Sequence, residues 1–165
     1  MTDDETIGKV CTWLATVTGC VVIQAYQSGP RPALPYIMVN LTGTDKVRDR
    51  AQDIEYIDLA PDELQAAPIL EVEWRFSVHG YGATGALSTD LLRRIHSALE
   101  LTQVMEPLWP DLRVHETSQT RNVPEFVNQV WEPRAQLDMM LRGITADGFI
   151  IDPIEQHTPA VVNAN

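Results

Sequence analysis

The sequence predicts a single α+β domain, in which a mostly antiparallel or mixed sheet carries two main helices packed on one face. Two segments place apolar residues at the spacing of an amphipathic helix, and several longer ones alternate apolar and polar residues like half-buried strands. A chain of 165 residues has the size of one ordinary domain. We expect a domain at 1–145 that includes a long charged loop, followed by an extended C-terminal arm at 146–165.

The first helix is predicted around the apolar positions from Ile7 to Val17. Thr2 or Asp3 is suited to cap its N-terminus, because an oxygen of either side chain can accept a hydrogen bond from a free backbone N–H group. Gly19 is suited to end the helix, since glycine readily adopts the left-handed conformation that follows many helices.

Two strands are expected next. Residues 20–26 are predicted to form a short strand, and the three prolines within 27–35 favour a stiff, extended connection. Residues 36–43 then alternate, with Ile37 and Val39 on the apolar side. This alternation predicts a second half-buried strand.

Residues 43–68 interrupt the alternation with mixed charge and few apolar positions. A connection of this length is usually functional or disordered, although residues 55–59 are also suited to extend a hairpin arm. Interleaved charges of both signs suit specific protein recognition more than DNA binding, and the alternative is a mobile, solvated loop. The candidate partner-contact residues are Asp45, Lys46, Arg48, Asp49, Arg50 and Asp53.

Gly80, Gly82 and Gly85 lie between a predicted strand at 69–81 and a predicted helix, where dinucleotide-binding folds carry the pattern G-x-G-x-x-G. The strand alternates apolar and polar residues, whereas the central strand of a doubly wound sheet is apolar on both faces. No second strand ending in an acidic residue follows at the required distance. We therefore interpret Gly80, Tyr81 and Gly82 as a structural turn in which glycine supplies a positive φ.

The second main helix is expected to begin with Thr84 as its N-cap. A turn and a strand are expected within 107–119. The apolar face of the helix is expected to consist of Leu87, Leu91, Ile95, Ala98 and Leu99.

A last long strand is predicted at 131–144, and Pro133 marks its start because proline lacks the N–H that a sheet ladder needs. Its inward residues are expected to be Ala135, Leu137, Met139 and Leu141. The chain beyond it mixes a short apolar cluster with proline and asparagine, which indicates an arm outside the core. The candidate inter-subunit residues of this arm are Phe149, Ile150 and Ile151.

The composition excludes several classes of protein. The chain has 23 acidic residues against 12 Lys and Arg, a net charge of −11, which argues against affinity for DNA phosphates. Its two cysteines, Cys11 and Cys20, provide no disulfide framework and favour a reducing compartment. With no long apolar run and an acidic N-terminus, we expect neither a membrane span nor a signal peptide, and a protein made in the cytoplasm.

No catalytic, cofactor-binding or metal-binding residue is predicted. Ser88 lacks the G-x-S-x-G elbow of a nucleophilic serine. The residues alone therefore indicate an acidic α+β domain without an assigned reaction. The histidines, none of which has the spacing of a metal motif, are His79, His96, His115 and His157.

Four segments, taken in order, resemble the neck or tail terminator (tail-completion) proteins of long-tailed bacteriophages. They are 13–19 at the end of the first helix, 30–37 with its prolines, 78–82 with its glycines, and 131–138. The resemblance covers roughly residues 5–145, and in the family such segments are fold elements rather than ligand contacts. This sequence departs from the family pattern by its proline within the last segment and by its acidic insertion around 45–66.

The resemblance implies a virion structural protein, not an enzyme, that caps the finished tail tube, stops its polymerisation and joins the tail to the head connector. Such proteins form rings, here expected to be homohexamers, and genomic DNA passes through the lumen without specific binding. The expected partners are further copies of the chain, the tail tube protein and the connector, in the neck of the virion. The charge of −11 predicts an acidic or neutral lumen wall rather than one lined by Arg31, Lys46, Arg48 and Arg50.

Two other classes remain open. One is another phage head-closure or minor tail adaptor protein, which position in the particle would distinguish. The other is a small soluble enzyme whose acidic groups converge only in three dimensions. A bound metal, or a pocket with converging Asp and His side chains, would favour the enzyme.

Overall fold

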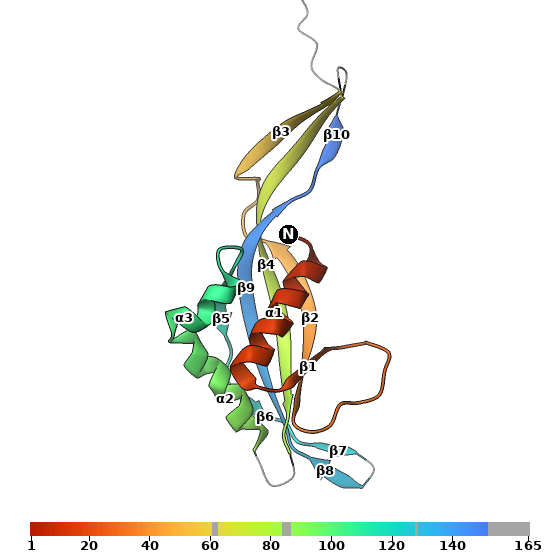
Figure 1. Ribbon diagram of the computed structural model, residues 1–165, viewed down its shortest axis with the longest axis vertical. Coiled ribbons are helices and arrows are strands. Elements are labelled where there is room, and N and C mark those ends of the chain that lie inside the picture. Colours follow the sequence, from red (N-terminus) through yellow and green to blue (C-terminus); the bar gives the residue numbers. More distant parts are fainter. Residues whose placement is uncertain (61–62, 84–86, 128, 152–165) are drawn as a thin grey trace, which may run out of the picture.

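The computed structural model describes residues 1–60, 63–83, 87–127 and 129–151. Figure 1 shows an elongated molecule, with a sheet whose helices lie on one face and a narrow arm at one end. This is a single-domain α+β fold, as the sequence predicts. The elements are α1 (Asp3–Thr18), β1 (Val21–Gln24), β2 (Tyr36–Lys46), β3 (Asp53–Ala60), β4 (Glu63–Tyr81), α2 (Ser88–Leu99), α3 (Thr102–Met105), η1 (Glu106–Leu108), β5 (Leu112–Thr117), β6 (Arg121–Asn122), β7 (Glu125–Val127), β8 (Val130–Glu132), β9 (Arg134–Ala146) and β10 (Phe149–Ile151).

The main sheet is mixed and is built around β4. Its central order is β1-β2-β4-β9-β5, in which β1 runs parallel to β2 and the other neighbours are antiparallel. β3 and β10 pair with the N-terminal part of β4, and β6 pairs with β9. A separate two-stranded sheet consists of β7 and β8. The long strand β4 therefore belongs both to the body and to the arm (Figure 1).

α1 has the ends that the sequence predicts. The Thr2 hydroxyl accepts a hydrogen bond from the Glu5 backbone N–H, and the Glu5 carboxylate accepts one from the Thr2 N–H. This reciprocal capping box satisfies two backbone donors that the helix itself cannot pair. Gly19 closes the other end in the left-handed conformation, with φ of 71°. Its Cβ-free backbone makes that conformation inexpensive.

The core lies between the two main helices and one face of the sheet. β9 buries Ala135, Leu137, Met139 and Leu141 completely, which confirms the predicted alternation. β4 contributes Trp74, Phe76 and Val78 to the same face, and α1 contributes Val10, Trp13 and Leu14. Alternate strand residues point to opposite faces, so the polar residues of β4 and β9 lie on the face away from the helices.

The apolar face of α2 agrees with the sequence prediction except at its first residue. The helix begins at Ser88, and its N-cap Leu87, predicted to be inward, is 64% exposed. Ile95 and Ala98 are buried as predicted, Leu91 and Leu99 are partly buried against the core, and Leu92, which was not predicted, is also buried. Leu91 and Leu92 both lie towards the sheet at Gly80, whereas Leu87 precedes the helix and is not held by its periodicity. Thr84, the predicted N-cap, lies outside the described residues.

The expected turn at residues 80–82 is corrected by the structure. Gly80 and Tyr81 are the last residues of β4 and pair with both β2 and β9. A Cβ at Gly80 would lie 3.2 Å from Cδ2 of Leu92, so glycine allows α2 to approach the sheet rather than supplying a positive φ. The Gly82 N–H donates to the Pro133 carbonyl at 3.1 Å, which keeps the chain beside β9 for one more residue.

The charged segment forms the hairpin that residues 55–59 allowed, and not one long loop. β2 continues to Lys46, and β3 then pairs antiparallel with β4. Ile54 and Tyr56 alternate with charged residues, so this strand has the period of a sheet element despite its acidity. β10 pairs with the other edge of β4. Residues 152–165 of the predicted C-terminal arm lie outside the described residues, and the division at 145 stays a prediction.

Candidate assembly surfaces

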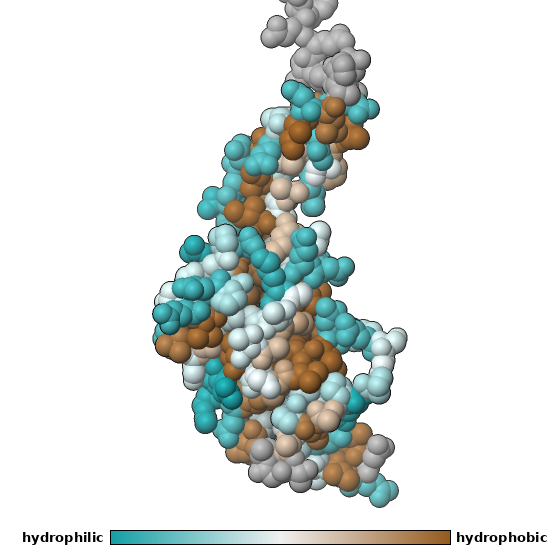
Figure 2. Space-filling view, viewed as in Figure 1, coloured by the Kyte–Doolittle hydropathy of each residue, from teal (hydrophilic) through white to brown (hydrophobic). Residues whose placement is uncertain are grey.

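The arm presents an apolar surface that no second layer of the described structure covers. Register places Tyr56, Ala66 and Phe149 side by side on β3, β4 and β10, where directly paired residues share a face. Tyr56 is 60% exposed and Phe149 is 59% exposed. Figure 2 shows apolar side chains along this arm. We define the arm face as Ile54, Tyr56, Leu64, Ala66, Pro68, Phe149 and Ile151.

The arm is also strongly acidic. Residues 53–70 contain Asp53, Glu55, Asp58 and Glu63 among their acids and no Lys or Arg. Asp58 lies on the arm face, two residues after Tyr56. An exposed sheet with two open edges is prone to nonspecific pairing, and charged side chains on it oppose that reaction.

The predicted partner-contact residues lie in the turn between β2 and β3 at the base of the arm and in the strand ends beside it. Backbone hydrogen bonds from Val47 to Glu71 at 2.8 Å and from Gln52 to Ile69 at 2.9 Å hold this turn against β4. Arg48 Nε lies 3.4 Å from Glu71 Oε2, and Lys46 donates to the Asp49 carbonyl. All six candidates, Asp45, Lys46, Arg48, Asp49, Arg50 and Asp53, are exposed.

A second apolar projection, which the sequence analysis did not predict, lies at the opposite end of the molecule (Figure 1). In the β7–β8 hairpin, the rings of Phe126 and Trp131 lie 5.1 Å apart, and Trp131 is 65% exposed. The sequence carries one signal for this hairpin, the β-forming pairs 126–127 and 130–131 separated by two residues. In the structure, Gln129 between them adopts a positive φ of 65°. The predicted inter-subunit residues Phe149, Ile150 and Ile151 lie at the other end, on β10.

Arg31 links the proline-rich segment between β1 and β2 to strand β8. Its guanidinium forms a two-pronged ion pair with Glu132 and donates from Nε to the Tyr36 hydroxyl at 2.7 Å. Tyr36 stacks on Tyr81 with ring centroids 4.5 Å apart. The hydrogen bond with Glu132 raises the pKa of Arg31 and lowers the pKa of Glu132. This cation is therefore already matched to a carboxylate.

The sheet face away from the helices carries a polar network around His79. Arg134 Nη2 lies 3.1 Å from His79 Nδ1, and because arginine only donates, this nitrogen accepts. Nε2 then carries the proton and donates to Ser77 Oγ at 3.3 Å. Ser77 donates in turn to Asp138 Oδ1 at 2.8 Å and accepts from Gln136 Nε2 at 2.9 Å. All three hydrogen-bonding positions of the serine are occupied, which suits a structural network and not a nucleophile.

The His79 network makes stability dependent on pH. Burial, followed by the nearby Arg134, lowers the pKa of His79 below its ordinary value of 6.5. The unfolded chain therefore binds this proton more readily, and we expect the free energy of unfolding to fall as the pH drops from 6.5 towards 5. His79→Gln should flatten this slope in urea titrations, because glutamine can still accept from Arg134 and donate to Ser77. The exposed residue His115 supplies the control, and equal slopes for His79→Gln and His115→Gln would refute the assignment.

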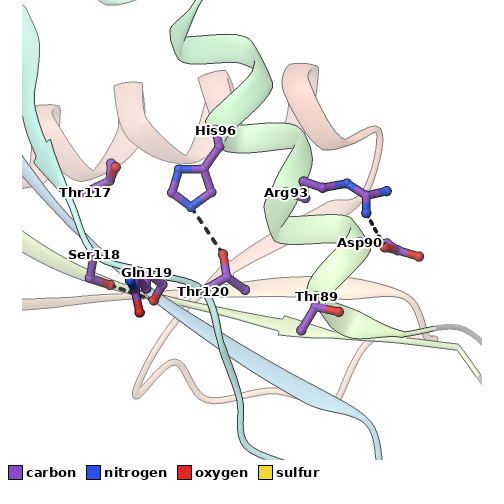
Figure 3. Close-up of a pocket in the computed structure, with 8 residues that line it drawn as sticks. All are labelled: Thr89, Asp90, Arg93, His96, Thr117, Ser118, Gln119 and Thr120. Carbon is purple, nitrogen blue, oxygen red and sulfur yellow. Dashed lines mark hydrogen bonds and ion pairs between the residues drawn. The ribbon is translucent and has the colours of Figure 1, made fainter.

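A shallow groove between α2 and the chain after β5 has polar walls (Figure 3). His96 Nε2 lies 3.2 Å from Thr120 Oγ1, and Arg93 pairs with Asp90 at 3.0 Å. Figure 3 shows the Arg93–Asp90 pair directed away from the imidazole. The groove brings together hydroxyl groups and one histidine, and the Asp90 carboxylate on its wall is paired with Arg93.

Two further properties concern the described part of the chain. It contains no group of three or more His, Cys, Asp or Glu side chains arranged to hold a metal ion. None of its helices combines the length and the apolar composition needed to cross a membrane.

The fold and its surfaces define a single-domain α+β protein with exposed apolar projections, which are typical of chains that assemble with others. The sequence matches the family model described as phage neck terminator protein over residues 6–164, so the chain belongs to this family. No match was found among curated proteins. The resemblance drawn from the sequence is thereby confirmed, and the chain belongs to a family of structural proteins of the phage neck.

Proposed function

We propose that this protein caps the finished tail tube, stops its polymerisation and joins the tail to the head connector. It acts as a homohexameric ring through which the genome passes. The observation that carries the proposal is membership of the neck terminator family over nearly the whole chain. The genome is a transient occupant of the ring and not a specifically bound ligand.

The exposed projections support assembly into a ring. The arm and the β7–β8 hairpin lie at opposite ends of the molecule and carry different side chains. A contact between two different surfaces of one chain is heterologous, and it forms a closed ring when the rotation between neighbours closes. Apolar patches on such projections supply the area that a stable contact buries.

The charge distribution supports a lumen that does not retain DNA. Arg31 is paired with Glu132, and Arg48 lies beside Glu71, so neither is an uncompensated cation. DNA binding requires unpaired Lys or Arg that displace counterions from phosphates. With a net charge of −11, the lumen wall is acidic or neutral in this proposal, and a ring map with Arg31, Lys46, Arg48 and Arg50 lining the lumen would contradict it.

Native mass measurement and negative-stain images of the purified chain, alone and mixed with tail tubes, test the function. The expected result is a closed ring that occupies one end of each tube and prevents further growth. A strict monomer that ignores the tubes would overturn the proposal. Rings that attach to heads but not to tubes would instead identify a head-closure or adaptor protein.

The turn at the base of the arm is proposed to dock on the tube or the connector. The triple variant Lys46→Ser, Arg48→Ser, Arg50→Ser should still form rings, because all three side chains are exposed. Head–tail joining at low salt should slow about tenfold, since exposed charges act mainly on the rate of association. The control is Arg93→Ser, an exposed arginine on α2 that leaves the turn intact. Joining by the triple variant at the control rate would remove the turn from the docking surface.

A further inference from the structure

We propose that the arm face of one copy docks in a groove beside α3 of the next copy, and that this contact builds the ring. The α3 groove has an apolar part formed by Leu99, Met105, Trp109 and Val114, and a polar part that includes Arg113 and Glu116. The inference rests on the ring proposed above and specifies which surfaces of the chain form it. Its partner is a second copy of this chain.

The arm requires a cover that the described chain does not provide. Within the described residues, β3 and β10 pair only with β4, and neither face of this three-stranded extension is packed by a helix (Figure 1). A sheet this small needs a second layer before its apolar side chains contribute to stability. Tyr56 and Phe149 keep more than half of their surface exposed in the single chain. Docking would remove both of these aromatic side chains from water.

The α3 groove has the matching composition. Its wall includes Met105 and the Trp109 ring, and the Arg113 guanidinium lies 5.9 Å from the centre of that ring. Leu101, which directly precedes α3, is 56% exposed. Apolar anchors with an aromatic residue and an arginine are the composition of the centre of many protein interfaces.

A local charge match at Arg113 favours a second copy as the occupant. The arm has acids and no cations over residues 53–70, and Asp58 lies on the arm face itself. Arg113 lines the groove together with Glu116. Arg113 is exposed and forms no salt bridge within the described part of the chain, so it is the groove's cation for the acidic arm. A chain of net charge −11 repels its copies in general, so self-association requires a local match of opposite charges.

The two surfaces lie at different places on the chain, so the same contact can form between each copy and the next. The arm extends from one end of the body, whereas α3 lies on the flank of the body (Figure 1). The uninterrupted strand β4 directs the arm away from the body. Each copy therefore offers its arm to one neighbour and its groove to another, which is the arrangement of a closed heterologous ring.

Cross-linking of mixed single-cysteine variants tests the contact. Tyr56→Cys and Leu101→Cys are made separately in a chain whose native cysteines are removed by Cys11→Ala and Cys20→Ser. A short bismaleimide should give a covalent dimer only when the two variants are mixed. A chain that carries both cysteines should give a ladder that ends at the ring. Rings without the mixed cross-link would overturn the inference and leave the proposed function standing.

Matched substitutions provide an independent readout. Tyr56→Ser should shift the ring-to-monomer midpoint to at least tenfold higher concentration, whereas Tyr26→Ser should not, because Tyr26 is 95% exposed and lies outside the arm. Arg113→Glu should weaken the ring similarly, and its control Arg93→Glu alters a pair on the other groove. Ring midpoints that are the same in all four variants would refute the contact.

The outcomes separate the two proposals. If the wild-type chain alone is a monomer, the mixed cross-linking is repeated with tail tubes present. Absence of the cross-link on capped tubes overturns the inference alone. Absence of capping as well overturns the proposed function. Circular dichroism of each variant confirms that the monomer is folded.

Discussion

Gly143→Ala is expected to destabilise the protein by about 3 kcal/mol, because a Cβ at this position has no space. It would lie 2.3 Å from the Asp111 carbonyl oxygen and 3.1 Å from the Trp74 ring. The oxygen belongs to the backbone, so this clash can be relieved only if the chain before β5 moves away from β9. Thermal unfolding of a domain of this size should then occur roughly 6–12 °C lower than in the wild type.

Gly43→Ala is the matched control. Gly43 also lies in a strand of the main sheet, and a Cβ there would meet nothing within 4 Å. We expect its free energy of unfolding to stay within about 0.5 kcal/mol of the wild type, since alanine also reduces the freedom of the unfolded chain. Equal urea midpoints for Gly143→Ala and Gly43→Ala would show that the contact with Asp111 is not rigid.

Trp74→Ala should reduce the free energy of unfolding by about 4 kcal/mol. The side chain is completely buried, and its indole N–H donates to Asp3 Oδ1 at 2.7 Å. It therefore connects the centre of the sheet to the first turn of α1. The substitution leaves a cavity and an unpaired carboxylate together, and urea denaturation followed by far-UV circular dichroism measures the combined loss.

The control for this prediction is Trp131→Ala. Trp131 is 65% exposed on β8 and contacts Phe126, so its loss should cost less than about 1 kcal/mol. If the two tryptophan variants unfold at the same urea concentration, Trp74 does not have the central packing role that its burial implies.

The elements whose signals are local were predictable from the sequence. α1 carries its cap at Thr2 and its stop at Gly19, and both act within one helical turn. β9 has a strict alternation of buried residues from Ala135 to Leu141, because one of its faces packs against the helices. In each case the residues that specify the element also lie within it.

The features that depend on distant residues could not be predicted in the same way. Gly80 is required because Leu92, on a different element, packs against the strand there. The network of Ser77, His79 and Asp138 depends on the register between β4 and β9, which alternation alone does not determine.

The assembly surfaces were predicted only in part. The charged turn and the apolar residues of β10 were identified by composition, and both are exposed. Their position at the base and along one edge of the same arm follows from the pairing of β3 and β10 with β4. The β7–β8 hairpin was missed because its strands have only three residues each, too few to show a period.

β4 has a mechanical consequence for a protein positioned between two parts of a particle. Its 19 residues span about 60 Å at roughly 3.3 Å each, and they run from the arm to the far end of the body. An extended strand cannot lengthen appreciably, and its pairing with β9 continues without a shift from Ile69 to Tyr81. Tension applied to the arm is therefore carried in shear by a long row of hydrogen bonds that must yield together. A pull on one end of this protein loads its centre rather than peeling away its edge.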